Sequence, residues 1–360
     1  MEEREGEGVC SFHSMRYFQA LALLALADCA ATEPFPPAPV EVLVVVNRTA
    51  RTLSVVPTAA PNTGISILLG ASSDVPAGVA ARAGIALVPL GADDAVVVVD
   101  LRAGTVRNTF PLAPNSGATG AAIVDDSIGY VANPGLNTVT RINYLTGDTA
   151  SVAVGVRPQG LIFTRGKLFV LNGNLNGALA SIGASWLSVI DPVTNALATG
   201  IDSIPLLGPG NARSAAVGPD GLLYVMSAGD SGTGEGRLSI VNPVTREELA
   251  SFPGFGNLPG AVAATGDHLF VSSWAEGLMA FDTRLREVTR GAGEGFAVAT
   301  NSSVATGAHD RVYAISSGPC SGGVGGTAHI LRAGDLVQTG TIPLGECATG
   351  ALITTVPAAP

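Results

Sequence analysis

The chain has 360 residues, of which 47% are hydrophobic and only 13% charged, and its formal net charge is −10. This negative balance argues against nucleic acid and anionic lipid surfaces as partners, because both are bound through basic patches. The 46 glycines and 23 prolines are spread along the chain, which is typical of many short buried strands joined by tight turns.

The first 29 residues have the features of an export signal. From Met15 the chain reads MRYFQALALLALADC, in which Arg16 provides a short positive region and residues 17–27 an apolar stretch. That stretch has signal-peptide length and is too short to span a bilayer. The residues before Met15 are acidic and unlike a signal sequence, so Met15 is the candidate true start. We therefore assign residues 1–29 to a leader.

The end of this leader resembles a bacterial lipobox. Leu26, Ala27, Asp28 and Cys29 follow its order, with Asp28 in the place of the usual small residue. Two outcomes are open: Cys29 is lipidated, or signal peptidase cleaves after Ala27. Both predict an exported protein, in the periplasm or as a lipoprotein of the outer membrane or cell surface. Any contact with the membrane would be through the lipid anchor, and the Pro-rich residues 30–40 would form a semi-rigid tether.

A hairpin pattern recurs along the remainder of the chain. Residues 95–112, AVVVVDLRAGTVRNTFPL, alternate between apolar and polar, turn at residues 102–104 and alternate again. Similar hairpins begin at residues 52, 138, 186, 237, 278 and 329. Their spacing of roughly 40 to 50 residues is that of a four-stranded propeller blade.

Each hairpin is preceded by a strand of small residues, a turn and a strand of aromatic or branched residues. The small-residue segments begin near Val75, Gly117, Arg157, Asn211, Leu258, Asn301 and Cys347. The first hairpin lacks such a strand before it, and the last small-residue strand lacks a hairpin after it. We therefore predict an all-β, seven-bladed β-propeller over residues 41–356, whose ring is closed when residues 347–355 pair with residues 42–47 and complete the first blade.

One blade carries a recognisable motif. Residues 128–148, IGYVANPGLNTVTRINYLTGD, resemble the YVTN repeat of bacterial surface and periplasmic seven-bladed propellers, with Tyr130, Val131 and Asn133 at its name-giving positions. The run VIDPVTN at residues 189–195 is similar to the second hairpin of that family. The resemblance extends in weakened form over residues 41–356. It implies the propeller fold and an envelope location, and it implies no particular activity.

The sequence contains no convincing catalytic or metal-binding constellation. Metal-dependent propeller enzymes bring carboxylates, histidines or arginines from several inner strands to the axial channel. Here the expected inner strands carry mainly alanine, glycine, serine, valine and proline, and His268, His309 and His329 fall in turns or at a hairpin start. We expect no catalytic residue, no metal and no cofactor.

The candidate binding face is the one on which the inner strands start. Three loops between second and third strands are long, at residues 172–185, 227–237 and 316–327, and propeller topology places them on that face. The residues that we expect to contribute to binding there are Arg157, Gln159, Trp186, Asn211, Arg213, Asp230, Glu235 and Arg237. The expected partner is an unknown protein or a small polar ligand, bound by a monomer.

Two of the four cysteines lie within the predicted propeller. Cys10 precedes the candidate start and Cys29 belongs to the leader, so Cys320 and Cys347 remain in the exported body. Export implies an oxidising compartment, and both residues belong to the same face of the propeller. We therefore predict a Cys320–Cys347 disulfide that attaches the closing strand to blade seven.

These observations favour a non-catalytic binding or scaffolding module of the bacterial cell envelope. The alternative is a lactonase-like hydrolase or lyase that uses the channel mouth, with Arg157 and Arg213 stabilising an anion. An axial metal, or carboxylates close to Arg213, would favour the enzyme. An empty channel lined by alanine would favour binding.

Overall fold

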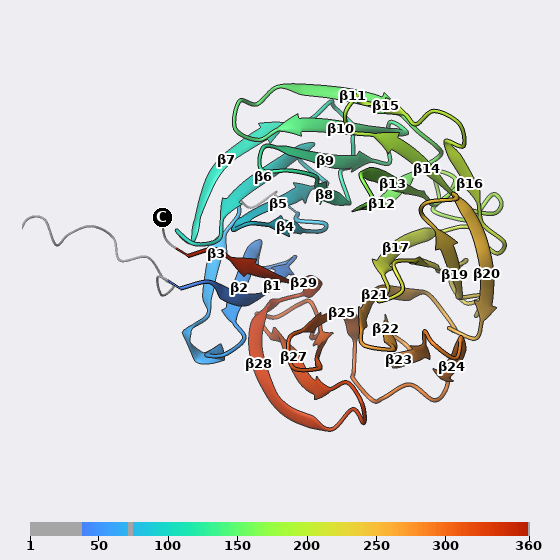
Figure 1. The fold of residues 1–360 in the computed structure, drawn as a ribbon. Helices are drawn as coiled ribbons and strands as arrows, with labels where there is room; N and C mark the ends of the chain where they lie inside the picture. Colours follow the sequence, from blue (N-terminus) through green and yellow to red (C-terminus); the bar gives the residue numbers. More distant parts are fainter. Residues whose placement is uncertain (1–37, 71–74, 359–360) are drawn as a thin grey trace, which may run out of the picture.

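Seven antiparallel sheets surround a central axis (Figure 1). The computed structural model describes residues 38–70 and 75–358. The leader, Cys29 and most of the predicted tether lie outside the described residues. In the described part of the chain, no helix has the length and hydropathy needed to cross a membrane. The fold is the predicted all-β, seven-bladed propeller.

The first three blades run from the chain ends to residue 153. Blade one contains, from the axis outward, β29 (Ala348–Val356), β1 (Val40–Asn47), β2 (Thr52–Pro57) and β3 (Ile65–Leu68), with a short 3-10 helix, η1 (Pro61–Thr63), before β3. Blade two contains β4 (Ala80–Arg82), β5 (Ile85–Leu90), β6 (Ala95–Asp100) and β7 (Thr105–Pro111). Blade three contains β8 (Ala121–Ile123), β9 (Ile128–Asn133), β10 (Thr138–Asn143) and β11 (Thr149–Ala153).

The last four blades follow in chain order. Blade four contains β12 (Pro158–Thr164), β13 (Lys167–Asn172), β14 (Trp186–Asp191), β15 (Ala196–Leu197) and β16 (Ser203–Pro205). Blade five contains β17 (Ala212–Val217), β18 (Leu223–Ser227), β19 (Arg237–Asn242) and β20 (Glu247–Pro253). Blade six contains β21 (Pro259–Thr265), β22 (His268–Ser273), β23 (Gly277–Asp282) and β24 (Glu287–Arg290). Blade seven contains β25 (Asn301–Gly307), β26 (Arg311–Ser316), β27 (Gly325–Arg332) and β28 (Gln338–Glu346).

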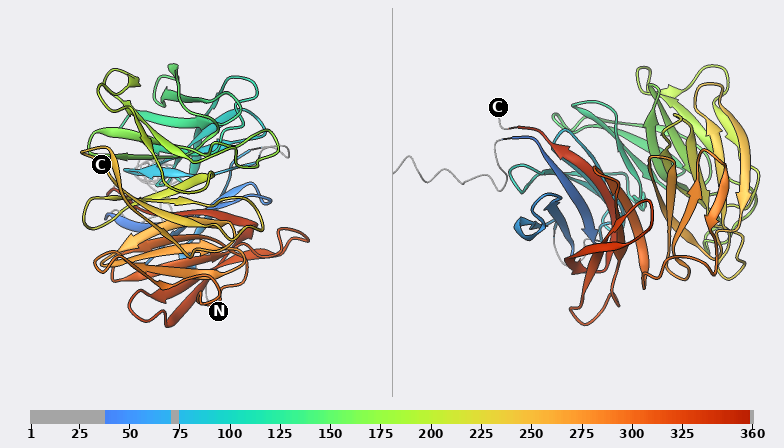
Figure 2. Two further views of the ribbon diagram at one scale, coloured as in Figure 1. Left: turned by 90° about the vertical axis from the view of Figure 1, so that its right-hand side faces the viewer. Right: turned by 60° about the horizontal axis from the view of Figure 1, so that its bottom comes forward.

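The C-terminal strand closes the ring as predicted. β29 pairs antiparallel with β1 from Val40 opposite Val356 to Asn47 opposite Ala348. Figures 1 and 2 show the two strands side by side, red against blue. Pairing of the two chain ends leaves no open sheet edge at the junction, which removes a template for aggregation.

The hydrophobic core consists of seven clusters of buried residues, and each cluster lies between two neighbouring blades. Between blades five and six, for example, Tyr224 and Met226 pack with Leu269, Val271 and Phe281. Middle strands are buried on both faces and are accordingly rich in branched and aromatic residues. Burial of each such side chain contributes roughly 1.5–3 kcal/mol.

Small residues on the inner strands allow the blades to converge. A Cβ atom at Gly120 would lie 2.5 Å from the carbonyl oxygen of Gln159 in the next blade, and a Cβ at Gly160 would lie 2.7 Å from the carbonyl oxygen of Arg213. Neither backbone could accommodate such a contact. Glycine at these positions therefore permits three successive inner strands to approach the axis.

Blade four differs from the simple hairpin expected at residues 186–199. Its outer edge is divided between β15 and β16, and both segments pair with β14. The division occurs around Gly200, whose positive φ of 80° turns the backbone out of the extended region. The predicted hairpin covers β14 and β15, whereas β16 lies beyond it and was not predicted.

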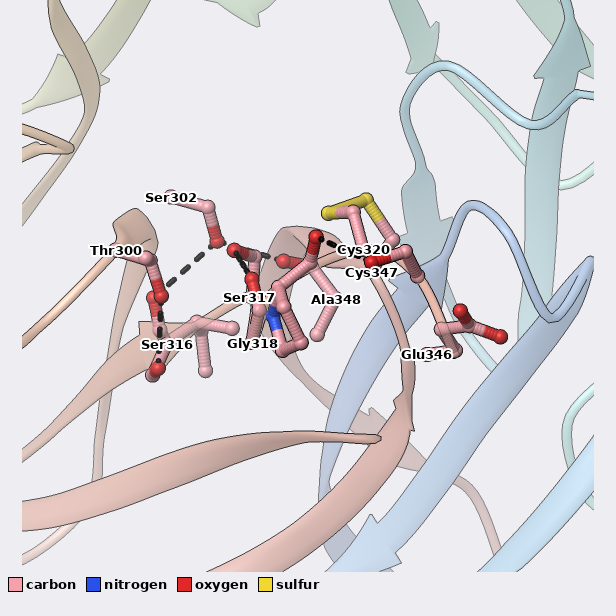
Figure 3. The surroundings of a disulfide bond; sticks show 12 residues. Thr300, Ser302, Ser316, Ser317, Gly318, Cys320, Glu346, Cys347 and Ala348 are labelled. Carbon is pink, nitrogen blue, oxygen red and sulfur yellow. Dashed lines mark hydrogen bonds between the residues drawn. A yellow bond between two sulfur atoms is a disulfide. The ribbon is translucent and has the colours of Figure 1, made fainter. Parts of the chain in front are cut away.

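The predicted disulfide is present between Cys320 and Cys347 (Figure 3). Cys320 lies in the loop between β26 and β27, and Cys347 immediately precedes β29. The bond therefore connects blade seven to the strand that completes blade one.

A hydrogen bond from Tyr130 links blades three and four. The hydroxyl of this fully buried tyrosine donates to Oδ1 of Asn195, 3.0 Å away, in the turn between β14 and β15. We expect Tyr130→Phe to lower the free energy of unfolding by about 1 kcal/mol, because the half-buried Asn195 acceptor loses its donor. Denaturant unfolding would measure the change. In a double-mutant cycle with Asn195→Gly, which suits the positive φ at this position, the two effects should not add. Full additivity would contradict a direct interaction.

Candidate functional site: the channel and its mouth

A repeated backbone feature begins the inner strands. In five blades the residue directly before the inner strand has a left-handed conformation. These residues are Arg157, Asn211, Leu258, Thr300 and Cys347. Non-glycine residues adopt this conformation infrequently. The chain therefore turns sharply as it arrives from the outer edge of the previous blade and enters the next one beside the axis.

The start of the inner strands also contains β-bulges. The register shifts between Pro158 and Gly160, between Ala212 and Ser214, and at corresponding places in β21, β25 and β29. A bulge leaves one residue without a partner across the strands and re-aims its side chain. In blades four, five, seven and one, the residues in this position are Gln159, Arg213, Ser302 and Thr349. All four line the channel.

The axial channel is built by all seven blades. Its cavity has a volume of about 340 Å3 and is lined by short stretches of every inner strand or the segment before it. Most lining residues are glycine, alanine, serine or threonine, and Gln159 and Arg213 are the long polar side chains among them. The channel therefore contains many small hydroxyls and one guanidinium.

Arg213 is isolated from compensating charge. None of the described residues forms a hydrogen bond or ion pair with its side chain. The side chain has solvent-accessible surface because it faces the open channel, while the blades surround it on all sides. This desolvation lowers the pKa of the Arg213 guanidinium, but an arginine remains protonated in proteins. The channel thus carries a fixed positive charge.

A second cavity, of about 470 Å3, forms the mouth of the channel on the long-loop face. Arg213 lines both cavities, and at the mouth it is joined by Arg48, Trp274, Ser302 and Thr349. Arg48 lies in the turn between β1 and β2, and Trp274, 53% exposed, lies in the turn between β22 and β23. The mouth therefore combines two arginines, an exposed aromatic ring and hydroxyls.

Arg157, Asn211 and Trp186 lie at or just before the starts of β12, β17 and β14, on the predicted face and outside the two channel cavities. None of them is among the residues that line the channel or its mouth. The Asn211 side chain is buried and donates from Nδ2 to the carbonyl of Gly229, and its Oδ1 accepts from Nε2 of Gln159 at 3.2 Å. The Trp186 ring packs closely over Gly155. The backbone N–H of Arg157 donates to Oδ1 of Asn137, which fixes the segment between β11 and β12 against blade three.

The other three predicted residues meet in a separate cavity on the same face. Asp230, Glu235 and Arg237 line a space of about 640 Å3 between the long loops of blades four and five. The loops contact each other there, because the backbone N–H of Ser181 donates to Oδ1 of Asp230 at 2.7 Å. Arg237 donates to the hydroxyl of Ser251, whereas the exposed Glu235 carboxylate has no hydrogen-bond or ion-pair partner among residues 38–70 and 75–358.

Asp94 and Asp125 each belong to a pair of consecutive aspartates, and both lie in turns between strands. Asp94 accepts hydrogen bonds from the backbone of Asn115 and Gly117 and from the hydroxyl of Ser116. Burial raises the pKa of the Asp94 carboxyl, and these hydrogen bonds lower it by more, so that the net shift is downward. Asp125 caps the backbone of Ser127 and Ile128 in the same way. In the described chain, no three metal-ligating side chains are grouped together.

Sequence reasoning did not identify Arg48, and it placed Trp274 near the mouth without assigning it to the binding face. Both lie in short turns between second and third strands, where neither length nor composition distinguishes them from other blades. The available signal was topological, since every such turn borders the face on which inner strands start. Thr119 of blade three, which also lines the channel and its mouth, could have been found by alignment with Gln159 and Arg213.

Comparisons with known proteins support the fold. No protein-family model matches the chain, and no curated protein sequence matches it. Among solved structures, the chain is similar to hydrazine synthase of Kuenenia stuttgartiensis, with a TM-score of 0.61 and 13% identity over 77% of this chain and 89% of that one. It is also similar to dihydro-heme d1 dehydrogenase NirN in complex with DHE, with a TM-score of 0.57 and 13% identity over 91% of this chain and 78% of that one. Identities this low establish a shared architecture and nothing about activity.

Proposed function

We propose that this protein is an exported, non-catalytic binding or scaffolding module of the bacterial cell envelope, and that it contacts its partner with the long-loop face. The observation that carries the proposal is the meeting of two loops, at residues 173–185 and 228–236, around the 640 Å3 cavity. Glu235 and Arg237 provide opposite charges on its wall. Binding sites in proteins commonly consist of such loops on a rigid scaffold.

Other features support this proposal. The disulfide suits an oxidising compartment, in agreement with the signal-like leader. The channel is lined by glycine, alanine and hydroxyl side chains, which favours binding over the alternative of a lactonase-like hydrolase or lyase at the channel mouth. The separation of Arg157 from the channel also removes one of the two arginines that the alternative would use.

Shortening the loop tips should abolish partner binding while preserving the fold. The tips at residues 177–179, 231–234 and 321–322 can be shortened without removing Ser181, Asp230 or Cys320, which make the internal connections. We expect the melting temperature to change little, because loop length has only a weak effect on closure entropy. Retention of partners from envelope extracts should fall at least about tenfold, since about 1.4 kcal/mol of lost contact suffices.

A photo-crosslinking pair would locate the contact. A crosslinker at Glu235 should capture the partner, whereas one at Val193, which is 91% exposed in the turn between β14 and β15 on the opposite face, should not. Undiminished retention by the shortened variant, together with capture from Val193, would place the binding site on the opposite face.

A further inference from the structure

We infer that the mouth of the axial channel is a binding site for a small oxyanion, a carboxylate or an inorganic ion, held by Arg213 and Arg48. This inference goes beyond partner binding at the loops and concerns a different cavity. It begins with two arginines, from blades five and one, that line the same cavity. Guanidinium groups bind oxyanions through parallel charge-assisted hydrogen bonds.

The two arginines at the mouth contrast with the acidic composition of the whole chain. The chain has 29 acidic and 19 basic residues, yet the residues that line the mouth include two arginines and no carboxylate. Neither arginine side chain has an ion-pair or hydrogen-bond partner among the described residues. The blades around Arg213 limit its hydration, while its side chain keeps solvent access through the open channel. A bound oxyanion would neutralise its charge there.

Hydroxyl groups on the channel wall complete the donor set. The Ser214 hydroxyl oxygen, on the channel wall, accepts from the backbone N–H of Val262 at 3.0 Å. This hydroxyl therefore retains its own hydrogen for a ligand, since no described acceptor takes it. Thr349 adds a hydroxyl that lines both the channel and its mouth. An oxyanion, which only accepts hydrogen bonds, matches this set better than a cation would.

The two cavities have room for such a ligand. The channel has a volume of about 340 Å3 and its mouth about 470 Å3, which accommodates an inorganic oxyanion or a carboxylate of a few carbon atoms together with water. Bulges place Arg213, Ser302 and Thr349 on the wall of both cavities from three blades, and the Ser302 hydroxyl donates there to the backbone carbonyl of Ala348 at 2.7 Å. Because sheets rather than loops hold them, the donors are pre-organised and lose little conformational entropy on binding.

The test uses sulfate, phosphate and succinate as probes at constant ionic strength. Trp274 borders the site and is one of only two tryptophans in the chain, so its fluorescence should report binding, and calorimetry should confirm it. Arg213→Gln should weaken binding about tenfold to a hundredfold, and Arg48→Gln should also weaken it, because each removes a charge-assisted bond. Arg107→Gln, on the exposed outer strand of blade two, is the matched control and should bind as the parent does.

The outcomes separate the possible ligands and the two proposals. Tighter binding of succinate than of sulfate and phosphate would identify a carboxylate site, and the reverse order an inorganic oxyanion site. Lack of saturable binding of all three probes at millimolar concentration would overturn the inference, as would undiminished binding to both Arg213→Gln and Arg48→Gln. None of these variants alters the long loops, so failure here would leave partner binding at the loops unaffected.

Discussion

Deletion of all residues after Gly345 should abolish cooperative unfolding of the propeller. The deletion removes β29 and exposes the paired edge of β1. It also removes Ala348 and Val356, both fully buried, from two cores. Net domain stability is about 5–15 kcal/mol, and a whole buried strand contributes a large part of that. We expect a broad, non-cooperative melting curve and aggregation through the exposed edge.

A matched deletion separates the role of the closing strand and its disulfide from that of the residues that follow. Removal of residues 357–360 leaves β29 intact and eliminates only the contact between Arg102 and the carbonyl of Pro357, among the described interactions of this tail. This variant should melt within a few degrees of the parent. Calorimetry and light scattering on both proteins would provide the comparison. A protein ending at Gly345 that melts cooperatively at the parental temperature would refute the structural importance of ring closure.

Replacement of both Cys320 and Cys347 by serine should lower the free energy of unfolding by about 3–4 kcal/mol. The disulfide joins residues separated by 27 positions, and in the chain-entropy model closure of such a loop destabilises the unfolded state by that amount. Loss of the disulfide should loosen β29 more than the other strands, because the bond attaches this strand to blade seven. Guanidinium unfolding of the parent and the variant, under non-reducing conditions, would measure the difference.

Reduction of the parent protein is the control for this substitution. The reduced parent should unfold near the midpoint of the double-serine variant, and the variant itself should not respond to reductant. Equal stability of the oxidised parent and the variant would show that the hydrogen bonds between β1 and β29 hold the ring without help. A variant less stable than the reduced parent would instead reveal a packing role for the buried Cys347 side chain.

Ring closure and the disulfide were accessible from sequence because both follow from counting repeats. Seven small-residue strands and seven hairpins, out of phase at the chain ends, require pairing between the ends. The same count places Cys320 and Cys347 on one face. Gln159 and Arg213 were predicted, together with Arg157 and Asn211, at the inner-strand starts that surround the channel mouth, and of these four Gln159 and Arg213 line the channel.

The remaining features depend on backbone detail that hydrophobic alternation does not encode. Arg157 and Asn211 have left-handed conformations, and the following bulges displace the alternation by one residue, so their side chains leave the channel while those of Gln159 and Arg213 enter it. Arg48 and Trp274 reach the mouth from short turns of blades far apart in sequence. Their proximity is a property of the closed ring.

The pairing of Val40 with Val356 also determines which face of the propeller points away from a support to which the N-terminal side is attached. β1 runs from Val40 toward Arg48 at the channel mouth, and β29 returns from Cys347 to Val356, so both ends of the propeller leave on the face opposite the long loops (Figure 2). A molecule held through residues that precede Val40 therefore directs Arg213 and the loop cavity away from its point of attachment. Immobilisation through the N-terminal side would leave the whole candidate binding face accessible from solution.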